Sequence, residues 1–302
     1  MKFTFNKQFM VLMFLLLNCF ASYAANEDLI TKQITLKLTE AGTLPNKIAS
    51  SKKNLVTNLK IIGEINGTDL RFIREMAGSD IDGNSTSGNL SVLDLSEARF
   101  VEGGVSYYYY DGYCHTSNDI IGEHAFSGCS SLTSVNIPSS VKWIGESTFS
   151  GCSSLTSVNI PSSVAYIGDC AFQDCSSLTS INIPSSVTEI REYAFDGCSS
   201  LISVKIPSSV TSIGGSAFSG CSGLRSIYVY AETVPSTVAG AFEGCDSKNC
   251  TVYVPKGTYD AYWLSEWGYF DNIVEFDATN IRNIVAEPEV QENARYAVNG
   301  QR

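Results

Sequence analysis

The sequence predicts a repeat solenoid, a fold in which short units of equal length stack and share one continuous core. Phenylalanine, cysteine and leucine each recur every 23 residues through the middle of the chain. The recurring positions are Phe126, Phe149, Phe172, Phe195 and Phe218; Cys129, Cys152, Cys175, Cys198 and Cys221; and Leu132, Leu155, Leu178, Leu201 and Leu224. Most positions that stay fixed between units are apolar. A short unit cannot bury such a face alone, so the units must stack on one another.

The repeating unit reads IGEHAFSGCSSLTSVNIPSSVKW in its first copy, residues 121–143, and five regular copies cover residues 121–235. Leu132, Val135 and Ile137 match the L-x-x-L-x-L strand pattern of a leucine-rich repeat, and Pro138 ends the strand because proline cannot continue the ladder. One strand per unit predicts a parallel β-sheet on the concave face of a right-handed superhelix. The remaining segments are too short for a long helix, which favours short helical or 3-10 turns on the opposite side.

The pattern I-G-x-x-A-F-x-G-C-x-S-L-x-S-V-x-I-P-x-S-V recurs over roughly residues 121–255, and it resembles the BspA-type leucine-rich repeat of surface antigens from host-associated bacteria. The segments INGTDLRFIREMAG (Ile65–Gly78) and NLSVLDLSEA (Asn89–Ala98) resemble the N-terminal capping region of the same proteins. The resemblance implies a protein that acts by adhesion or interaction, with diverse partners. The chain departs from the ordinary leucine-rich repeat where an asparagine ladder usually follows the strand: that place holds Ser140, Ser163, Ser186, Ser209 and Glu232.

Residues 1–24 have the layout of a secretory signal peptide, with Lys2 and Lys7, an apolar run from Phe9 to Phe20, and cleavage after Ala24. The run is too short to span a membrane, and no later segment reaches spanning length. We therefore expect an exported protein, extracellular or on the outer cell surface, without a transmembrane segment. Lipid anchoring at Cys19 is a less favoured alternative, because Asn18 occupies the place where a lipoprotein signal has a small residue.

Both ends of the solenoid are expected to carry a cap. Residues 26–118 form an N-terminal capping region with two diverged leucine-rich units, marked by Val56, Leu59 and Ile61 and by Leu90, Leu93 and Leu95. Between them, Thr68 is the expected N-cap of a helix that presents Leu70, Ile73, Met76 and Ala77 on one face. The solenoid covers residues 119–277 and ends in a diverged sixth unit followed by an aromatic segment, residues 258–270. Residues 278–302 form a polar tail with a truncated C-terminal β motif.

The cysteines are better explained by packing than by disulfides. The strict recurrence of Cys129 to Cys221 beside Phe and Leu predicts a ladder of small buried thiols. Neighbouring parallel strands seldom offer disulfide geometry. Cys170, at a variable position, and the pair Cys245 and Cys250, which flanks a turn, are the candidates for any bridge.

Catalytic and metal-binding motifs are missing from the sequence, so we expect no enzyme activity, cofactor or metal. The chain has two histidines, and the nearest approach to a nucleophile with its base is Cys114 next to His115. Adjacent residues rarely serve as such a pair, so a hydrolase is the weaker interpretation. Lys and Arg number 20 against 31 Asp and Glu, a formal net charge of −11. This charge opposes binding to nucleic acid or anionic lipid.

Two surfaces are candidates for ligand binding. On the strands, Ser and Asn side chains alternate with the core residues and face outward, and Lys205, Arg225, Tyr228 and Tyr230 interrupt this polar row. The second surface is VSYYYYDGYCH, residues 105–115, whose tyrosines are typical of protein interfaces and can also stack on sugars.

Each candidate surface also has a plain structural interpretation. The strand residues could be no more than solvated positions, and the tyrosines could pack over the cap junction. An extended, alternating segment would turn Tyr107 and Tyr109 inward and Tyr108 and Tyr110 outward. We therefore take Tyr108, Tyr110 and Tyr113 as the binding candidates of this segment.

The sequence thus predicts a non-catalytic binding protein, a secreted or cell-surface leucine-rich-repeat adhesin or protein-interaction module. Its expected partner is a host or bacterial surface protein. A surface glycan-binding protein and a structural spacer are the alternatives. Binding that is competed by sugars would distinguish the glycan-binding alternative from the leading hypothesis.

Overall fold

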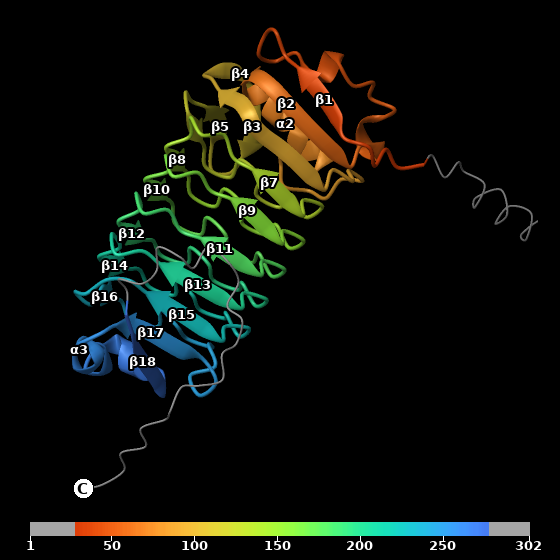
Figure 1. Ribbon diagram of the computed structural model, residues 1–302. Helices are drawn as coiled ribbons and strands as arrows, with labels where there is room; N and C mark the ends of the chain where they lie inside the picture. Colours follow the sequence, from red (N-terminus) through yellow and green to blue (C-terminus); the bar gives the residue numbers. More distant parts are fainter. Residues whose placement is uncertain (1–27, 278–302) are drawn as a thin grey trace, which may run out of the picture.

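The computed structural model describes residues 28–277. The expected signal peptide, Cys19 and the polar tail lie outside the described residues. Within them the chain winds as a solenoid, with one strand of each coil on the same side (Figure 1). These strands are β1 (Ile34–Lys37), β2 (Asn58–Ile65), β3 (Val92–Phe100), β7 (Ser134–Asn136), β9 (Ser157–Asn159), β11 (Ser180–Asn182), β13 (Ser203–Ile206), β15 (Ser226–Val229), β17 (Thr251–Pro255) and β18 (Asn272–Phe276).

The strands pair in parallel, in the order β1-β2-β3-β7-β9 and then β11-β13-β15-β17-β18. Equivalent residues of successive units lie opposite one another, as Ser134 does to Ser157 and Ser203 to Ser226. The parallel sheet predicted from the repeat is therefore confirmed. We call the outward side of these strands the strand face.

Apolar side chains fill the interior as ladders that run along the solenoid. The rings of Phe126, Phe149, Phe172, Phe195, Phe218 and Phe242 stack with centroids 5.2 to 5.7 Å apart and interplanar angles of 4 to 11°. The recurring cysteines form a parallel ladder, in which each thiol from Cys152 onward donates to a carbonyl of the preceding coil; for example, Cys175 Sγ lies 3.2 Å from the oxygen of Phe149. Burial raises the pKa of these thiols, to about 12 for Cys198.

All nine cysteines of the described chain are free, so the candidate bridges at Cys170 and at Cys245 with Cys250 are wrong. Cys245 continues the thiol ladder, with its Sγ 3.2 Å from the carbonyl oxygen of Phe218. Cys250, the residue that precedes β17 in the sequence, is fully buried. Both sulfurs are therefore used for packing against the core.

The side opposite the strand face differs from the prediction of helical or 3-10 turns. Each regular unit instead contributes a two-residue strand followed by hydrogen-bonded turns. These strands are β6 (Ile120–Ile121), β8 (Trp143–Ile144), β10 (Tyr166–Ile167), β12 (Glu189–Ile190), β14 (Ser212–Ile213) and β16 (Ser236–Thr237). In the turns, every second N–H donates to the next coil, as Phe126 N does to Thr148 O at 2.8 Å. Because these donors are used between coils, a continuous helical pattern cannot form.

Glycine is required after the two-residue strands, because the coils approach closely there. A Cβ added at Gly145, Gly168 or Gly214 would lie 2.6 Å from a backbone nitrogen of the preceding coil. Arg191 stands at the equivalent position of the fourth unit. The outer ladder is interrupted at this coil: β10 pairs with β8, whereas β12 pairs with β14.

The N-terminal cap contains α2 (Gly67–Met76), whose residues Leu70, Ile73 and Met76 are fully buried. The N-cap is Asn66 rather than Thr68: the Asn66 side chain accepts from Thr68 N, and the Asp69 carboxylate accepts from Asn66 N in a capping box. The cap also holds two 3-10 turns, η1 (Leu44–Asn46) and η2 (Lys53–Leu55), and an antiparallel hairpin of β4 (Gly103–Tyr109) and β5 (Tyr113–Thr116).

The cap provides hydrogen-bond donors to the first coil of the solenoid. In later coils the carbonyls equivalent to those of Glu123, Ala125 and Ser127 accept from the preceding coil. The first regular coil has none before it, and residues of the cap replace the missing donors. Tyr107 Oη donates to Glu123 O at 2.9 Å, and the Arg74 guanidinium donates to Ala125 O at 3.2 Å and to Ser127 O at 3.0 Å.

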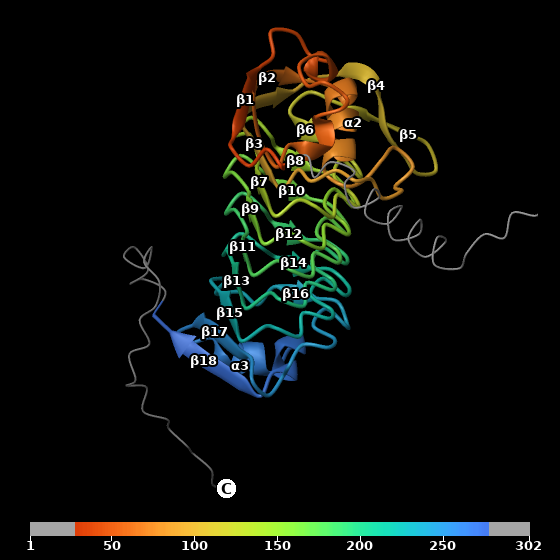
Figure 2. The same ribbon diagram turned by 90° about the vertical axis from the view of Figure 1, so that its right-hand side faces the viewer.

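The C-terminal end is covered by α3 (Tyr259–Trp263) and the 3-10 turn η3 (Glu266–Tyr269) (Figure 2). Tyr262, Trp267 and Phe270 are fully buried, and the last two rings contact Phe242, the final member of the phenylalanine ladder, with centroids 4.8 and 5.2 Å away. The aromatic residues of this segment therefore close the core.

Asp174 is expected to destabilise its coil, and replacing it with glycine should stabilise the protein. The equivalent residues Gly128, Gly151 and Gly197 have φ near +71°, and Asp174 is held at +57°. The left-handed region costs an L-residue about 1–2 kcal/mol, partly offset by the greater backbone entropy that glycine loses on folding. We expect Asp174→Gly to raise the unfolding free energy by about 0.5–1 kcal/mol in urea denaturation. The reverse change, Gly151→Asp, should lower it by a similar amount; equal stabilities for all three proteins would contradict the argument.

Candidate functional site

The tyrosine-rich segment is the tip of the β4–β5 hairpin. Tyr108 pairs with Cys114, Tyr109 pairs with Tyr113, and the turn passes through Asp111, which has φ of +47°. Tyr110 and Tyr113 expose 64% and 67% of their surface. The rings of Tyr109 and Tyr113 lie against one another, with centroids 5.0 Å apart.

The prediction of which tyrosine side chains face inward and which face outward is only partly correct. Tyr107 is buried and Tyr110 is exposed, as expected, but Tyr109 is also exposed, so its predicted inward position is wrong. Tyr108, expected to face outward, is partly buried and packs against the core. Its ring lies 4.3 Å from the guanidinium carbon of Arg74. The hairpin register shifts between Gly103 and Tyr108, so simple alternation does not hold along β4.

An open pocket of about 470 Å³ lies between the hairpin tip and the first coils of the solenoid. Tyr110, Tyr113 and His115 line it from the hairpin, and Glu123 and Trp143 line it from the solenoid. We call it the hairpin pocket. It brings two of the three predicted tyrosines into one site, and Tyr108 is not among its lining residues.

Trp143 was missed by the sequence reasoning. It is 44% exposed at the start of β8, and its ring stacks on that of Tyr166 with centroids 3.7 Å apart. Trp143, Tyr166, Glu189 and Ser212 occupy the same position in successive units. Large aromatic residues at a variable, outward position of the repeat were the signal that could have found it.

Carboxylates lie in the hairpin pocket and on the coils beside it, and Asp111 and Glu123 are among the residues that line the pocket. Glu123, Glu146 and Asp169 occupy equivalent positions of three successive coils. Partial burial, together with the neighbouring charges of Glu123 and Asp169, raises the pKa of Glu146. Asp169 is neutralised by Arg191, whose Nε and NH2 nitrogens lie 3.1 and 3.2 Å from the two carboxylate oxygens.

Cys114 and His115 offer little support for catalysis. Burial, with a contribution from Glu123, raises the pKa of the Cys114 thiol. A nucleophilic cysteine needs the opposite shift. The second histidine, His124, is buried, unlike His115; desolvation lowers its pKa, and its ring lies against the rings of Tyr108 and Tyr110.

The second predicted surface lies on the strand face near the C-terminal end. Lys205 pairs in register with Asn182 on one side and with Tyr228 on the other, and the Tyr228 ring stacks on that of Tyr253 at 4.6 Å. Lys205 and Tyr230 line a shallow pocket of about 320 Å³. The repeat pattern did not point to Tyr253, which belongs to the diverged sixth unit.

Arg225 does not join this group. It precedes β15, whereas Tyr230 follows the same strand, so the two lie at opposite ends of it. The Arg225 guanidinium donates to the carbonyls of Ser222 and Leu224 in its own turn. The hairpin residues and the strand-face residues are likewise separate surfaces, at the N-terminal and C-terminal parts of the solenoid (Figure 1).

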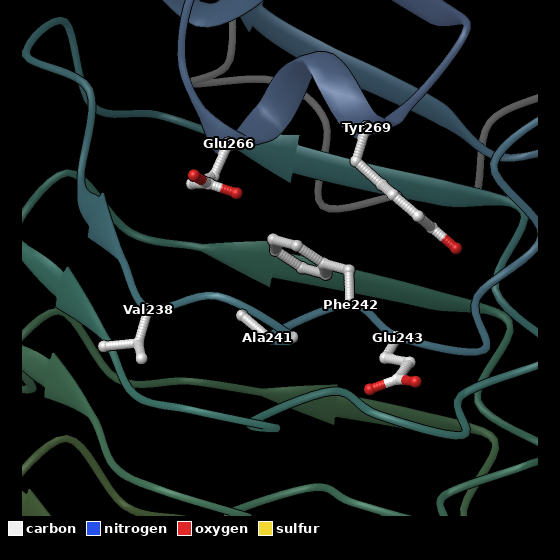
Figure 3. A pocket seen from close by; sticks show the side chains of 7 residues that line it. Val238, Ala241, Phe242, Glu243, Glu266 and Tyr269 are labelled. Atoms are coloured by element: carbon white, nitrogen blue, oxygen red, sulfur yellow. The ribbon is translucent and has the colours of Figure 1, made fainter.

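A third pocket, of about 290 Å³, lies between the sixth coil and η3. In Figure 3, Glu266 and Tyr269 extend from η3 above Phe242 and Glu243 of the coil. Tyr269 Oη donates to Cys245 O at 2.9 Å, which ties the cap to the coil. In the described part of the chain, no group of three or more His, Cys, Asp or Glu side chains could hold a metal ion.

Comparison with known proteins agrees with this architecture. Residues 119–252 match the family model of the BspA type leucine rich repeat region in six copies. This part of the chain therefore consists of leucine-rich repeats. Its repeats belong to the BspA type, as the sequence pattern predicted, and the sixth copy is the diverged unit. A repeat region of this family indicates a protein-interaction module. No curated protein matches the chain.

Several solved structures are similar. The leucine rich repeat protein of T. pallidum (TpLRR) is 27% identical over 49% of this chain and 78% of its own, with a TM-score of 0.38. A leucine-rich repeat protein from Bacteroides ovatus is 18% identical over 74% of this chain and 62% of its own, with a TM-score of 0.37. One from Eubacterium ventriosum is 16% identical over 80% of each chain, with a TM-score of 0.34. Among the residues that the structure describes, no helix is both long and apolar enough to cross a membrane.

Proposed function

We propose that this chain is a non-catalytic adhesin or protein-interaction module, exported to the cell surface or the medium, and that it binds a host or bacterial surface protein through the hairpin pocket. The observation that carries the proposal is the group of exposed aromatic rings, Tyr110, Tyr113 and Trp143, around one open pocket. Large, rigid aromatic side chains supply much of the binding energy at protein interfaces. Soluble proteins seldom leave such a group uncovered without a partner.

Export rests on residues 1–24, which lie outside the described residues, and lipid anchoring at Cys19 remains the alternative means of retention. The raised pKa of Cys114 supports a binding role over hydrolysis. The strand face is the second candidate for contact with the partner, with Lys205, Tyr228 and Tyr230 as its distinctive residues.

Glycan binding is the second candidate function. The observation that favours it is the nearly parallel pair of Tyr228 and Tyr253 on the strand face, with an interplanar angle of 8°. Flat aromatic surfaces can stack on sugar rings. Competition by free sugars, together with loss of binding in Tyr228→Ser, would support this function over the leading one.

The test is a binding screen of the purified full chain against host matrix proteins, bacterial surface proteins and glycans. We expect saturable binding to a protein, weakened about tenfold or more when Tyr110 and Tyr113 are both changed to serine, because truncated interface tyrosines typically cost more than 1 kcal/mol. Tyr259→Ser, at an exposed tyrosine of the C-terminal cap, is the control and should bind as the parent does. A double variant with unchanged affinity would remove the hairpin from the interface, and no binding at all would contradict the adhesin proposal.

A further inference from the structure

The hairpin pocket combines aromatic walls with acidic groups. Tyr110, Tyr113 and Trp143 line it together with the side chains of Asp111 and Glu123. An aromatic face attracts a cation through its ring quadrupole, and a nearby carboxylate adds direct charge attraction. The residues that line the pocket therefore favour a positively charged occupant with a flat or flexible side chain.

The solenoid itself contains an occupied version of this arrangement. The guanidinium carbon of Arg191 lies 5.6 Å from the centre of the Tyr166 ring, and the same group forms a two-pronged ion pair with Asp169. Ring, carboxylate and cation come from two consecutive coils. This coil shows how the repeat holds an arginine side chain on its outer surface.

One coil earlier the same ring and carboxylate positions are present without the cation. Trp143 is equivalent to Tyr166, Glu146 is equivalent to Asp169, and Gly168 stands where Arg191 stands in the next coil. Gly168 has no side chain to supply the charge. Within the described residues, neither Glu123 nor Glu146 forms an ion pair.

The carboxylates of this region are therefore uncompensated. The raised pKa of Glu146 reflects this, because burial and the charges of Glu123 and Asp169 disfavour its ionised form. A cation placed beside Glu146 would relieve that repulsion. The formal net charge of −11 would also attract a basic partner over longer distances.

We propose that the hairpin pocket accepts a lysine or arginine side chain of a protein partner, so that the partner presents a basic segment to this end of the solenoid. The proposal rests on the proposed function, since it names the chemistry that the hairpin pocket recognises. Trp143 and the exposed tyrosines contact the aliphatic and cationic parts of the side chain, while Glu123, which lines the pocket, and Glu146, at the equivalent position of the next coil, pair with its charge.

The test measures binding of a fluorescent hexa-arginine peptide to the full chain at physiological ionic strength. Glu123→Gln/Glu146→Gln removes one carboxylate that lines the hairpin pocket and its equivalent in the next coil, and Glu243→Gln/Glu266→Gln removes two carboxylates from the pocket at the opposite end. The two double variants have the same net charge. We expect the first to weaken binding about tenfold and the second to change it less than twofold; Trp143→Ala should weaken it as the first does.

Equal losses in the two double variants would show attraction to overall charge alone and would overturn the proposal. Tight binding of a hexa-glutamate peptide or of a neutral oligosaccharide in the hairpin pocket would do the same. The two proposals fail separately. A protein partner lost on changing Tyr110 and Tyr113, yet retained by Glu123→Gln/Glu146→Gln, would keep the adhesin and reject the basic side chain. If the peptide binds specifically in the hairpin pocket but the screen finds no protein partner, the basic side chain is kept and the adhesin is rejected.

Discussion

Changing Phe172 to alanine is expected to lower the free energy of unfolding by about 3–5 kcal/mol, as large an effect as a single buried side chain usually has. The Phe172 ring is fully buried and stacks on Phe149 on one side and on Phe195 on the other, at 5.3 and 5.4 Å. Its loss leaves a cavity that two neighbouring coils share. Because a solenoid is held together by contacts between adjacent units, the defect weakens two interfaces at once.

Urea denaturation followed by circular dichroism measures this change. Phe172→Leu, which keeps most of the apolar volume, should lose less than half as much stability as Phe172→Ala. A loss below 1 kcal/mol for the alanine variant would mean that the ladder contributes little to holding the coils together.

Arg74→Met is expected to cost about 3 kcal/mol or more and to loosen the N-terminal cap. The Arg74 side chain is fully buried. Its guanidinium donates to the carbonyls of His124, Ala125 and Ser127 in the first coil. Removing a buried charged donor leaves these acceptors unsatisfied, and each unsatisfied acceptor costs about 1–3 kcal/mol.

Hydrogen exchange would locate the effect of Arg74→Met as well as its size. We expect faster exchange in α2 and in the turn that follows Gly122, with coils beyond Phe172 unaffected. Arg71→Met is the control. Arg71 lies on the same helix, but its side chain is 41% exposed and forms an ion pair with Glu75, with Nε 3.8 Å from Oε1. Such exposed pairs contribute less than about 1 kcal/mol. Similar losses in the two variants would contradict the role assigned to Arg74.

The repeating part of the fold was predictable because each position is observed several times within one chain. Comparing five copies separates core residues such as Phe172 from variable ones, and β2 and β3 followed from the spacing of their apolar residues. Features that occur once were harder to predict. The strand β1 (Ile34–Lys37) is four residues long and has no repeated counterpart. The capping residue Asn66 lies next to an equally plausible Thr68, and only backbone geometry separates them.

The candidate site was predicted in part for the same reason. The tyrosines were evident from composition, but the register shift in β4 changed which of them face outward. Trp143 joins the hairpin pocket only because the hairpin folds back over the first coil, a long-range contact that no local pattern contains. The two-residue outer strands are too short to leave a periodic signal, and inter-coil hydrogen bonds determine them.

In the turns that hold the phenylalanine ladder, the hydrogen bonds between coils run in one direction, from the N–H groups of one coil to the carbonyls of the next, beginning at the donors that Tyr107 and Arg74 supply. Every interior coil therefore presents the same chemistry to its two neighbours. The stack can gain or lose a whole unit without changing what either cap must satisfy. Each unit adds about 4.8 Å, the spacing of adjacent strands. The number of repeat units thus determines the distance between the β4–β5 hairpin and the strand-face residues Lys205, Tyr228 and Tyr230.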